Sequence, residues 1–125
     1  MAEPLLVQQS PLGDDLEAIA AQLTAAFEAI RDAVVAERPV VVLVEDGDLL
    51  GQGEVADAAL ATGLLGLARA FALEGSRRGW KVNTVSRRGE EQEEAALEAA
   101  GWLAGSGLSG QLVRAGTDHL GRVWP

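Results

Sequence analysis

Residues 40–44 read Val-Val-Val-Leu-Val. This run constrains the fold of the chain more than any other feature of the sequence. β-branched residues favour strands, and a strand exposed to water on one face would alternate apolar and polar residues. An unbroken apolar run is typical of a strand in a parallel sheet that is covered on both faces. The sequence must therefore supply further strands beside this one and helices for both faces.

Apolar runs and helical repeats alternate along the chain. Strands are predicted at residues 4–7, 40–44, 80–85 and 111–116. Helices are predicted at residues 15–37, 54–74 and 90–104. This order predicts one α/β domain over residues 1–125, with a four-stranded parallel sheet between helices in three layers. The turn-rich segment 45–53 is expected to be a loop.

Composition excludes several classes of function. The chain has 19 acidic and 10 basic residues among 125, which gives a net charge of −9. This charge disfavours partners that are themselves negative, such as nucleic acid and anionic membrane surfaces. No cysteine is present, so disulfides, thiolate metal sites and a cysteine nucleophile are excluded. The most apolar window, 55–73, contains Asp57 and Arg69, so we expect a buried helix rather than a membrane span, in a cytoplasmic protein.

The two long predicted helices each have a face of small residues. In the helix at 15–37 the larger apolar residues share one face: Leu16, Ile19, Leu23, Phe27, Ile30 and Val34. In the helix at 54–74 the face around Asp57 carries Leu60, Ala61, Leu64, Ala68, Phe71 and Ala72. The opposite face carries Ala59, Thr62, Gly63, Gly66, Ala70 and Leu73. Glycines let another backbone approach closely, so this face predicts a tight contact, either with a partner helix or with the sheet. If the sheet takes it, the Asp57 face points to the partner.

Four segments resemble, in chain order, the later half of a short-chain dehydrogenase/reductase (SDR). Residues 66–74, GLARAFALE, match the end of that family's catalytic helix. Residues 77–89, RRGWKVNTVSRRG, match the strand that follows and its exit, with Asn83 at the family's asparagine. Residues 108–116, LSGQLVRAG, look like its closing strand, and residues 5–11, LLVQQSP, are similar to its Leu-Val-Asn-Asn-Ala-Gly segment. Together these segments cover nearly the whole chain.

The resemblance implies a Rossmann-like half-fold. A doubly wound dinucleotide domain has two βαβαβ halves, and this chain corresponds to the later one. In that half each helix crosses to the neighbouring strand, so we expect the four strands to lie side by side in sequence order. No glycine-rich phosphate turn follows the first strand, and we therefore expect the cofactor-binding half to be missing and no nicotinamide cofactor to bind.

The positions that carry catalysis in the family hold other residues here. By the resemblance, the catalytic tyrosine and lysine correspond to Asp57 and Ala61, and the family's serine falls in the segment of Asp46. The chain contains no tyrosine at all. Glu45, Asp46 and Asp57 could instead hold a hard cation, but carboxylates are ordinary residues of loops and helix starts, so we predict no metal site. His119 is the only histidine, and no nucleophile motif accompanies it.

The positions near the family's cofactor differ as well. Gln8 and Gln9 stand at the two asparagines of the first segment, and Arg88-Gly89 stands where the family has Pro-Gly after the third strand. The resemblance therefore implies that these four positions do not bind a cofactor.

These observations predict a catalytically inactive SDR-like protein that acts by oligomerisation, or as a non-catalytic subunit beside a full-length SDR. Two alternatives stay open: an oxidoreductase component that supports NAD(P)-dependent reduction only in complex with a partner, and a module that binds a small apolar ligand in the vestigial cleft. SDR proteins commonly pair through the two corresponding helices, so the resemblance implies a homodimer, a homotetramer or a heteromer. The candidate interface residues are Ala59, Thr62, Gly63, Gly66, Ala70, Leu73, Ala25 and Ala29.

Overall fold

The structure is a computed structural model that describes residues 3–12 and 15–115. The strands in this part of the chain are β1 (Leu5–Gln8), β2 (Val40–Glu45), β3 (Val82–Arg87) and β4 (Leu112–Arg114). The helices are α1 (Glu17–Val35), α2 (Asp46–Leu49), α3 (Val55–Glu74) and α4 (Glu93–Ser106). Two 3₁₀ turns, η1 (Ser76–Arg78) and η2 (Glu90–Gln92), precede β3 and α4. The predicted alternation of strands and long helices is confirmed.

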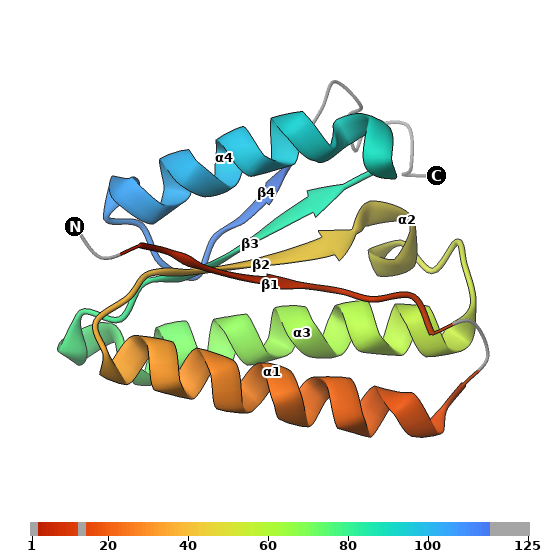
Figure 1. The fold of residues 1–125 in the computed structure, drawn as a ribbon, viewed down its shortest axis with the longest axis horizontal. Coiled ribbons are helices and arrows are strands. Elements are labelled where there is room, and N and C mark those ends of the chain that lie inside the picture. Colours follow the sequence, from red (N-terminus) through yellow and green to blue (C-terminus); the bar gives the residue numbers. More distant parts are fainter. Residues whose placement is uncertain (1–2, 13–14, 116–125) are drawn as a thin grey trace.

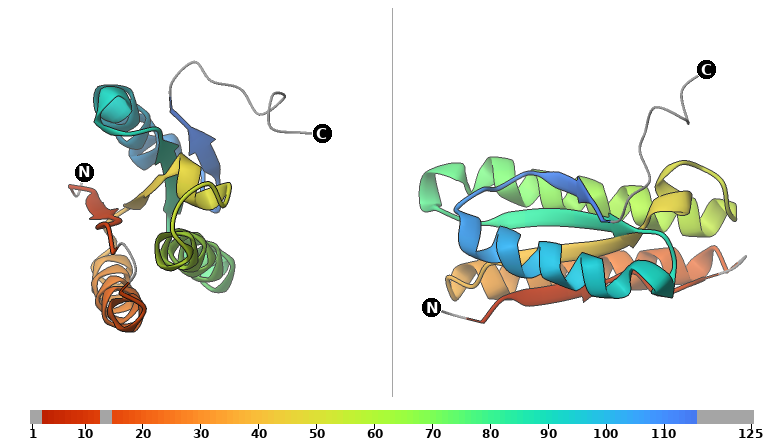
Figure 2. Two further views of the ribbon diagram at one scale, coloured as in Figure 1. Left: turned by 90° about the vertical axis from the view of Figure 1, so that its right-hand side faces the viewer. Right: turned by 90° about the horizontal axis from the view of Figure 1, so that it is seen from above.

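The four strands form one parallel sheet in the order β1-β2-β3-β4, as predicted. At the level of Val42 in β2, the neighbours are Val7 in β1 and Thr84 in β3. Helices α1 and α3 lie against one face of the sheet and α4 lies against the other, which gives three layers (Figures 1 and 2). Because every connection crosses back through a helix, all four strands end at the same edge of the sheet.

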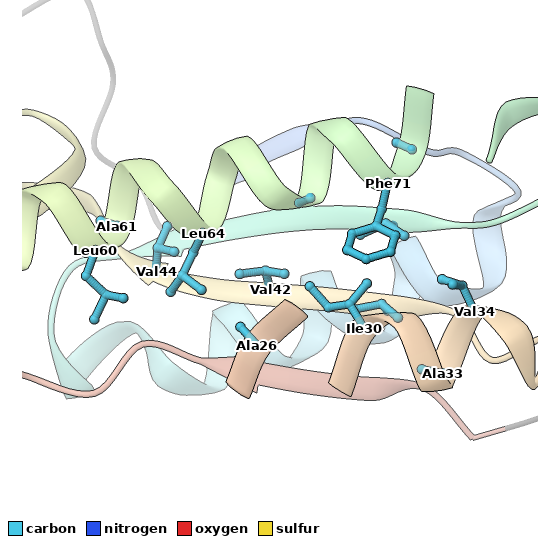
Figure 3. Close-up of a cluster of buried hydrophobic side chains, with 14 residues drawn as sticks. Ala26, Ile30, Ala33, Val34, Val42, Val44, Leu60, Ala61, Leu64 and Phe71 are labelled. Carbon is cyan, nitrogen blue, oxygen red and sulfur yellow. The ribbon is translucent and has the colours of Figure 1, made fainter. Parts of the chain in front are cut away.

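Strand β2 is buried on both faces, as its unbroken apolar run predicts. Val41 and Val42 have no exposed surface. Val42 belongs to a cluster with Ile30 of α1 and Leu64 of α3 (Figure 3), and Val41 belongs to a second cluster with Leu103 of α4. Full burial of one such side chain stabilises the fold by roughly 1.5–3 kcal/mol, so this strand is a major source of stability.

Helix α3 packs on the sheet through the face around Asp57. Its buried residues are Ala56, Leu60, Ala61, Leu64, Ala68, Phe71 and Ala72. The small-residue face therefore points away from the sheet. Of the two contacts predicted for this face, a partner helix or the sheet, the contact with the sheet is excluded. Gly63 contacts α1 within the chain, because a Cβ added there would lie 2.9 Å from Leu23 Cδ2.

The largest differences from the predicted elements lie at α2 and β3. The expected loop at 45–53 contains α2, whose turn is closed by a hydrogen bond from the N–H of Leu50 to the carbonyl of Asp46 at 3.1 Å. The third strand is Val82–Arg87 rather than 80–85, because the N–H of Trp80 donates to the carbonyl of Gly75 at 3.1 Å in a turn. The aromatic ring of Trp80 lies 6.2 Å from that of Phe71 and packs beneath the end of α3.

Among the described residues, α3 is long and apolar enough, by length and composition, to cross a membrane. The mean hydropathy of its most apolar window is 1.4. The same property is found in helices that pack on the core of a globular protein, which is how α3 is placed here. This helix therefore carries no argument for a membrane location.

Candidate functional site

The carboxyl edge of the sheet carries a buried ion pair. Asp46 begins α2 directly after β2, and 5% of its surface is exposed. Arg114, at the end of β4, donates from Nε to Asp46 Oδ1 at 2.8 Å and from Nη2 to Oδ2. Ser86 of β3 donates from Oγ to Asp46 Oδ1 at 2.9 Å. Three neighbouring strands are thus joined at the edge where doubly wound proteins bind their ligands.

The environment of Asp46 favours its charged form. The hydrogen bond from Arg114 holds the pKa of Asp46 below its ordinary value of 3.8, against the opposing effect of burial. The hydroxyl of Ser86 lowers this pKa further, as does the Arg88 guanidinium, which lies 3.9 Å from Oδ2. Asp46 is therefore a structural anion at neutral pH, with its oxygens already occupied by donors from the chain.

A pocket of about 470 Å³ opens at the same edge. Its lining comes from the segment after β1, from the ends of β2 and β3, and from the starts of the following helices: Gln8, Gln9, Ser10, Pro11, Glu45, Asp48, Asp57, Arg87, Gly89 and Glu90. The lining contains four carboxylates and one arginine. An anionic ligand would meet net repulsion in this pocket.

Gln9 connects the walls of this pocket. Its Oε1 accepts the N–H of Glu45 at 2.9 Å, and its Nε2 donates to Asp48 Oδ2 at 2.8 Å. Burial raises the pKa of Asp48, the bond from Gln9 lowers it, and the nearby charges of Asp57 and Glu45 raise it again. The net shift of this pKa is upward, as expected for a carboxyl group among other carboxylates.

The two positions matched to the family's tyrosine and lysine do not form a catalytic pair. Asp57 lies in the first turn of α3, and its Oδ1 accepts the N–H of Leu12 at 2.6 Å. This bond fixes the segment after β1 to α3. Ala61, one helical turn later, has no exposed surface and belongs to the core cluster beneath the sheet. The structure therefore brings Asp57 to the pocket and leaves Ala61 outside it.

The four positions matched to the family's cofactor region are divided in the same way. Gln8, Gln9 and Gly89 line the pocket. The N–H of Gly89 donates to Glu45 Oε2 at 3.0 Å, and Gly89 has a φ of 64°, a conformation that favours glycine. Arg88 is not part of that lining, and its N–H donates to Gln92 Oε1 at 2.7 Å.

Sequence reasoning missed Ser86, Arg114 and Asp48 as members of this edge. Ser86 follows the predicted third strand directly, and Arg114 lies in the predicted fourth, so the signal that could have identified them is their place at strand ends. In the described part of the chain no group of three or more His, Asp or Glu side chains is arranged to hold a metal. His119 lies outside the described residues.

The predicted interface residues lie mostly on the surface. Ala59, Thr62, Gly66, Ala70 and Leu73 are exposed on the outer face of α3, meaning the face turned away from the sheet. Ala25 of α1 is exposed too, whereas Gly63 and Ala29 are partly buried. A Cβ added at Gly66 would meet no atom within 4 Å. The outer face of α3 is therefore open in a single chain.

No family model matches the sequence, and no curated protein matches it. Solved structures do match. The citronellol catabolism dehydrogenase AtuB of Pseudomonas aeruginosa PAO1 superposes with a TM-score of 0.71 at 18% identity, over 90% of this chain and 60% of that one. A short chain oxidoreductase of the same organism, described as containing an atypical catalytic center, superposes with a TM-score of 0.61 at 16% identity, over 93% of this chain and 67% of that one.

Both similarities concern architecture, because identities below 20% carry no residue-level equivalence. The chain spans about three fifths of the length of AtuB, with its parallel sheet and helices in the same arrangement. The resemblance seen in the sequence is thus confirmed for the fold, and the protein has the Rossmann-like architecture of the short-chain dehydrogenases/reductases over part of their length.

Proposed function

We propose that the chain is a non-catalytic protein of the SDR fold that acts through association with another chain. The observation that carries this proposal is the role of Asp57, at the position where the resemblance expects the catalytic tyrosine. Its Oδ1 accepts the N–H of Leu12 at 2.6 Å, so the side chain serves the loop after β1. Reduction of a ketone needs a proton donor beside the substrate oxygen, whereas Asp57 acts here as a hydrogen-bond acceptor.

The position one turn along α3 supports the same proposal. A lysine there would be expected to lower the pKa of the proton donor through its charge. Ala61 has no charge and no exposed surface. A lysine at this position would have to leave the core to reach the pocket. Replacing Ala61 with lysine would therefore not by itself restore the charged partner of a proton donor at position 57.

The charge of the pocket supports the absence of a nicotinamide cofactor. Glu45, Asp48, Asp57 and Glu90 line it, and Arg87 is the arginine among them. A dinucleotide brings two negative phosphates, which need backbone N–H groups at a glycine-rich turn or basic side chains. A small apolar ligand is not favoured either, because it would remove water from these carboxylates without replacing their hydrogen bonds.

The deciding experiment is a titration of the purified chain with NADH and with NADPH, in which binding is measured by calorimetry and by nucleotide fluorescence. We expect no saturable binding below millimolar concentration. A dehydrogenase of known affinity for each nucleotide is the positive control for the same nucleotide solutions. Micromolar affinity for either nucleotide, or turnover of a ketone by the isolated chain, would overturn the proposal. Repeating the titration with a full-length SDR present tests the alternative in which the chain contributes to reduction only in a complex.

The outer face of α3 is the surface that we propose for association on the strength of the family resemblance. Leu73 is 76% exposed there, and Phe27 of the neighbouring α1 is 44% exposed. Exposed apolar side chains gathered on one surface are typical of interaction sites. The open space at Gly66 lets a second helix approach the backbone of α3. A second copy and a full-length SDR are the two partners proposed for this face.

A further inference from the structure

Strand β1 has unpaired backbone groups along its outer side. It is the edge strand of the sheet in the described residues, with β2 as its neighbour. The N–H groups of Leu5 and Gln9 point toward this neighbour. They donate, at 2.9 Å each, to the carbonyl of Pro39 just before β2 and to the carbonyl of Leu43 within it. Because backbone groups alternate along a strand, the N–H and C=O of Leu6 and Gln8 point away from β2. In a complete doubly wound sheet the corresponding strand is internal, and both of its sides are paired.

A groove without charged side chains runs beside this edge. It has a volume of about 410 Å³ and is lined by β1 and by α1, including Gln22, Ala25 and Ala29. Helix α1 lies directly under β1 at the same side of the molecule (Figure 2). In a chain with a net charge of −9, a neutral surface is where two copies can meet with the least repulsion. The small side chains of Ala25 and Ala29 allow two α1 helices to pack closely.

We propose that the β1 edge pairs with the β1 edge of a second copy, antiparallel and about a two-fold axis at Val7. The result is a continuous eight-stranded sheet, with the two α1 helices side by side beneath the junction. This inference rests on the proposed function, since it names a surface for the association. It concerns a different surface from the outer face of α3, so the two contacts together would build a tetramer.

The register of the proposed β1–β1 pair follows from which outward N–H and C=O groups of the strand can form hydrogen bonds. With Val7 on the axis, Leu6 of each copy faces Gln8 of the other, and each such pair exchanges two N–H···O bonds. A shift in one direction would place Pro4, which has no N–H, opposite Gln8. A shift in the other would require the N–H of Ser10, which already donates to Gln22 Oε1 at 3.3 Å. One register therefore uses every outward group of β1, and Pro4 limits the ladder to these residues.

A cysteine cross-link tests this register directly, because the chain has no native cysteine. In the proposed pair the two Val7 Cα atoms are about 4.5 Å apart, within the range of a disulfide. The matched control is Leu5→Cys, on the same strand and the same face, where the two copies would be separated by about 14 Å. We expect Val7→Cys to give a covalent dimer under mild oxidation at micromolar concentration, and Leu5→Cys to stay uncrosslinked. No cross-link at Val7, or equal cross-linking of both variants, overturns the proposal.

Native mass measurement of two variants at Gln8 gives an independent test. Gln8→Pro removes an outward N–H and no hydrogen bond within the chain, whereas Gln8→Ala keeps that N–H. A cooperative melting transition in each variant establishes that both fold. We expect Gln8→Pro to halve the mass of the assembly and Gln8→Ala to leave it unchanged. A wild-type monomer contradicts the edge pairing and leaves the heteromer with a full-length SDR as the form of association in the proposed function. An assembly that survives Gln8→Pro and gives no Val7→Cys cross-link contradicts the edge pairing alone.

Discussion

Replacing Asp46 with alanine removes the anion that joins the ends of β2, β3 and β4. Arg114 then loses two hydrogen bonds and Ser86 loses its acceptor. Removing one partner of a buried pair typically costs about 3–5 kcal/mol. The Arg114 side chain is 16% exposed and can regain part of its hydration, while Ser86 is 1% exposed and stays unsatisfied. We therefore expect a loss near the lower limit, about 3 kcal/mol, which is a large fraction of the stability of a small domain.

Urea unfolding followed by circular dichroism at pH 7 measures this loss. The matched control is Asp32→Ala, which breaks an ion pair with Arg31 whose side chains are 51% and 73% exposed. An exposed pair of this kind contributes about 0–1 kcal/mol, so the control should change the unfolding free energy little.

The pH dependence supplies a second readout for the Asp46 variant. The pKa of Asp46 is lowered in the fold, so its contribution is fully present above the ordinary value of 3.8 and is lost as the pH falls through the lower folded pKa. The difference in unfolding free energy between wild type and Asp46→Ala should therefore become smaller as the pH falls below about 4. A loss within about 0.5 kcal/mol of the control at pH 7, or a difference independent of pH, would refute the ion-pair argument.

The remaining predictions concern three single substitutions. Asp48→Asn should raise the unfolding free energy at pH 7 by a few tenths of a kcal/mol, because the pKa of Asp48 is raised in the fold and its charged form is disfavoured there. This gain should vanish as the pH falls below 3.8, where the carboxyl group is protonated in both states, and a gain that persists at pH 3 would contradict the assignment. Gly66→Leu should leave the fold intact, since the space there is open, and should lower the mass of the assembly in sedimentation. Gly63→Leu should instead destabilise the fold by roughly 1–3 kcal/mol through overpacking against Leu23, so equal melting of the two leucine variants would contradict the packing of α1 on α3.

The strands and their order could be predicted because their signals are local. The Val40–Val44 run shows burial on both faces in its own sequence, and alternation with helices then requires parallel strands. The face of α1 could not be predicted as well. Leu16 and Phe27 belong to the predicted apolar face of this helix and are 62% and 44% exposed, whereas Ala26 and Ala33 are buried. Hydrophobic size does not indicate where two elements approach so closely that alanine fits better than leucine.

Site residues could be predicted where the signal lies within one short segment of the sequence, and not where it depends on two distant segments. Asp57 and Gln9 were singled out through the resemblance, and both line the pocket. The ion pair of Asp46 with Arg114 spans 68 residues of sequence. It exists because strand register places the end of β4 beside that of β3, and neither charge pattern nor periodicity carries that register.

The distribution of satisfied and unsatisfied polar groups is the strongest support for association. At the carboxyl edge the carboxylates are occupied by donors of the chain itself: Asp46 by Arg114, Asp57 by the N–H of Leu12, and Glu45 by the N–H of Gly89. A ligand there would have to displace internal bonds before forming its own. The outward backbone groups of β1 and the open face of α3 have no such bonds to break. Under the proposed function, a second chain would therefore gain free energy more readily at these two surfaces than a ligand would at the carboxyl edge of the sheet.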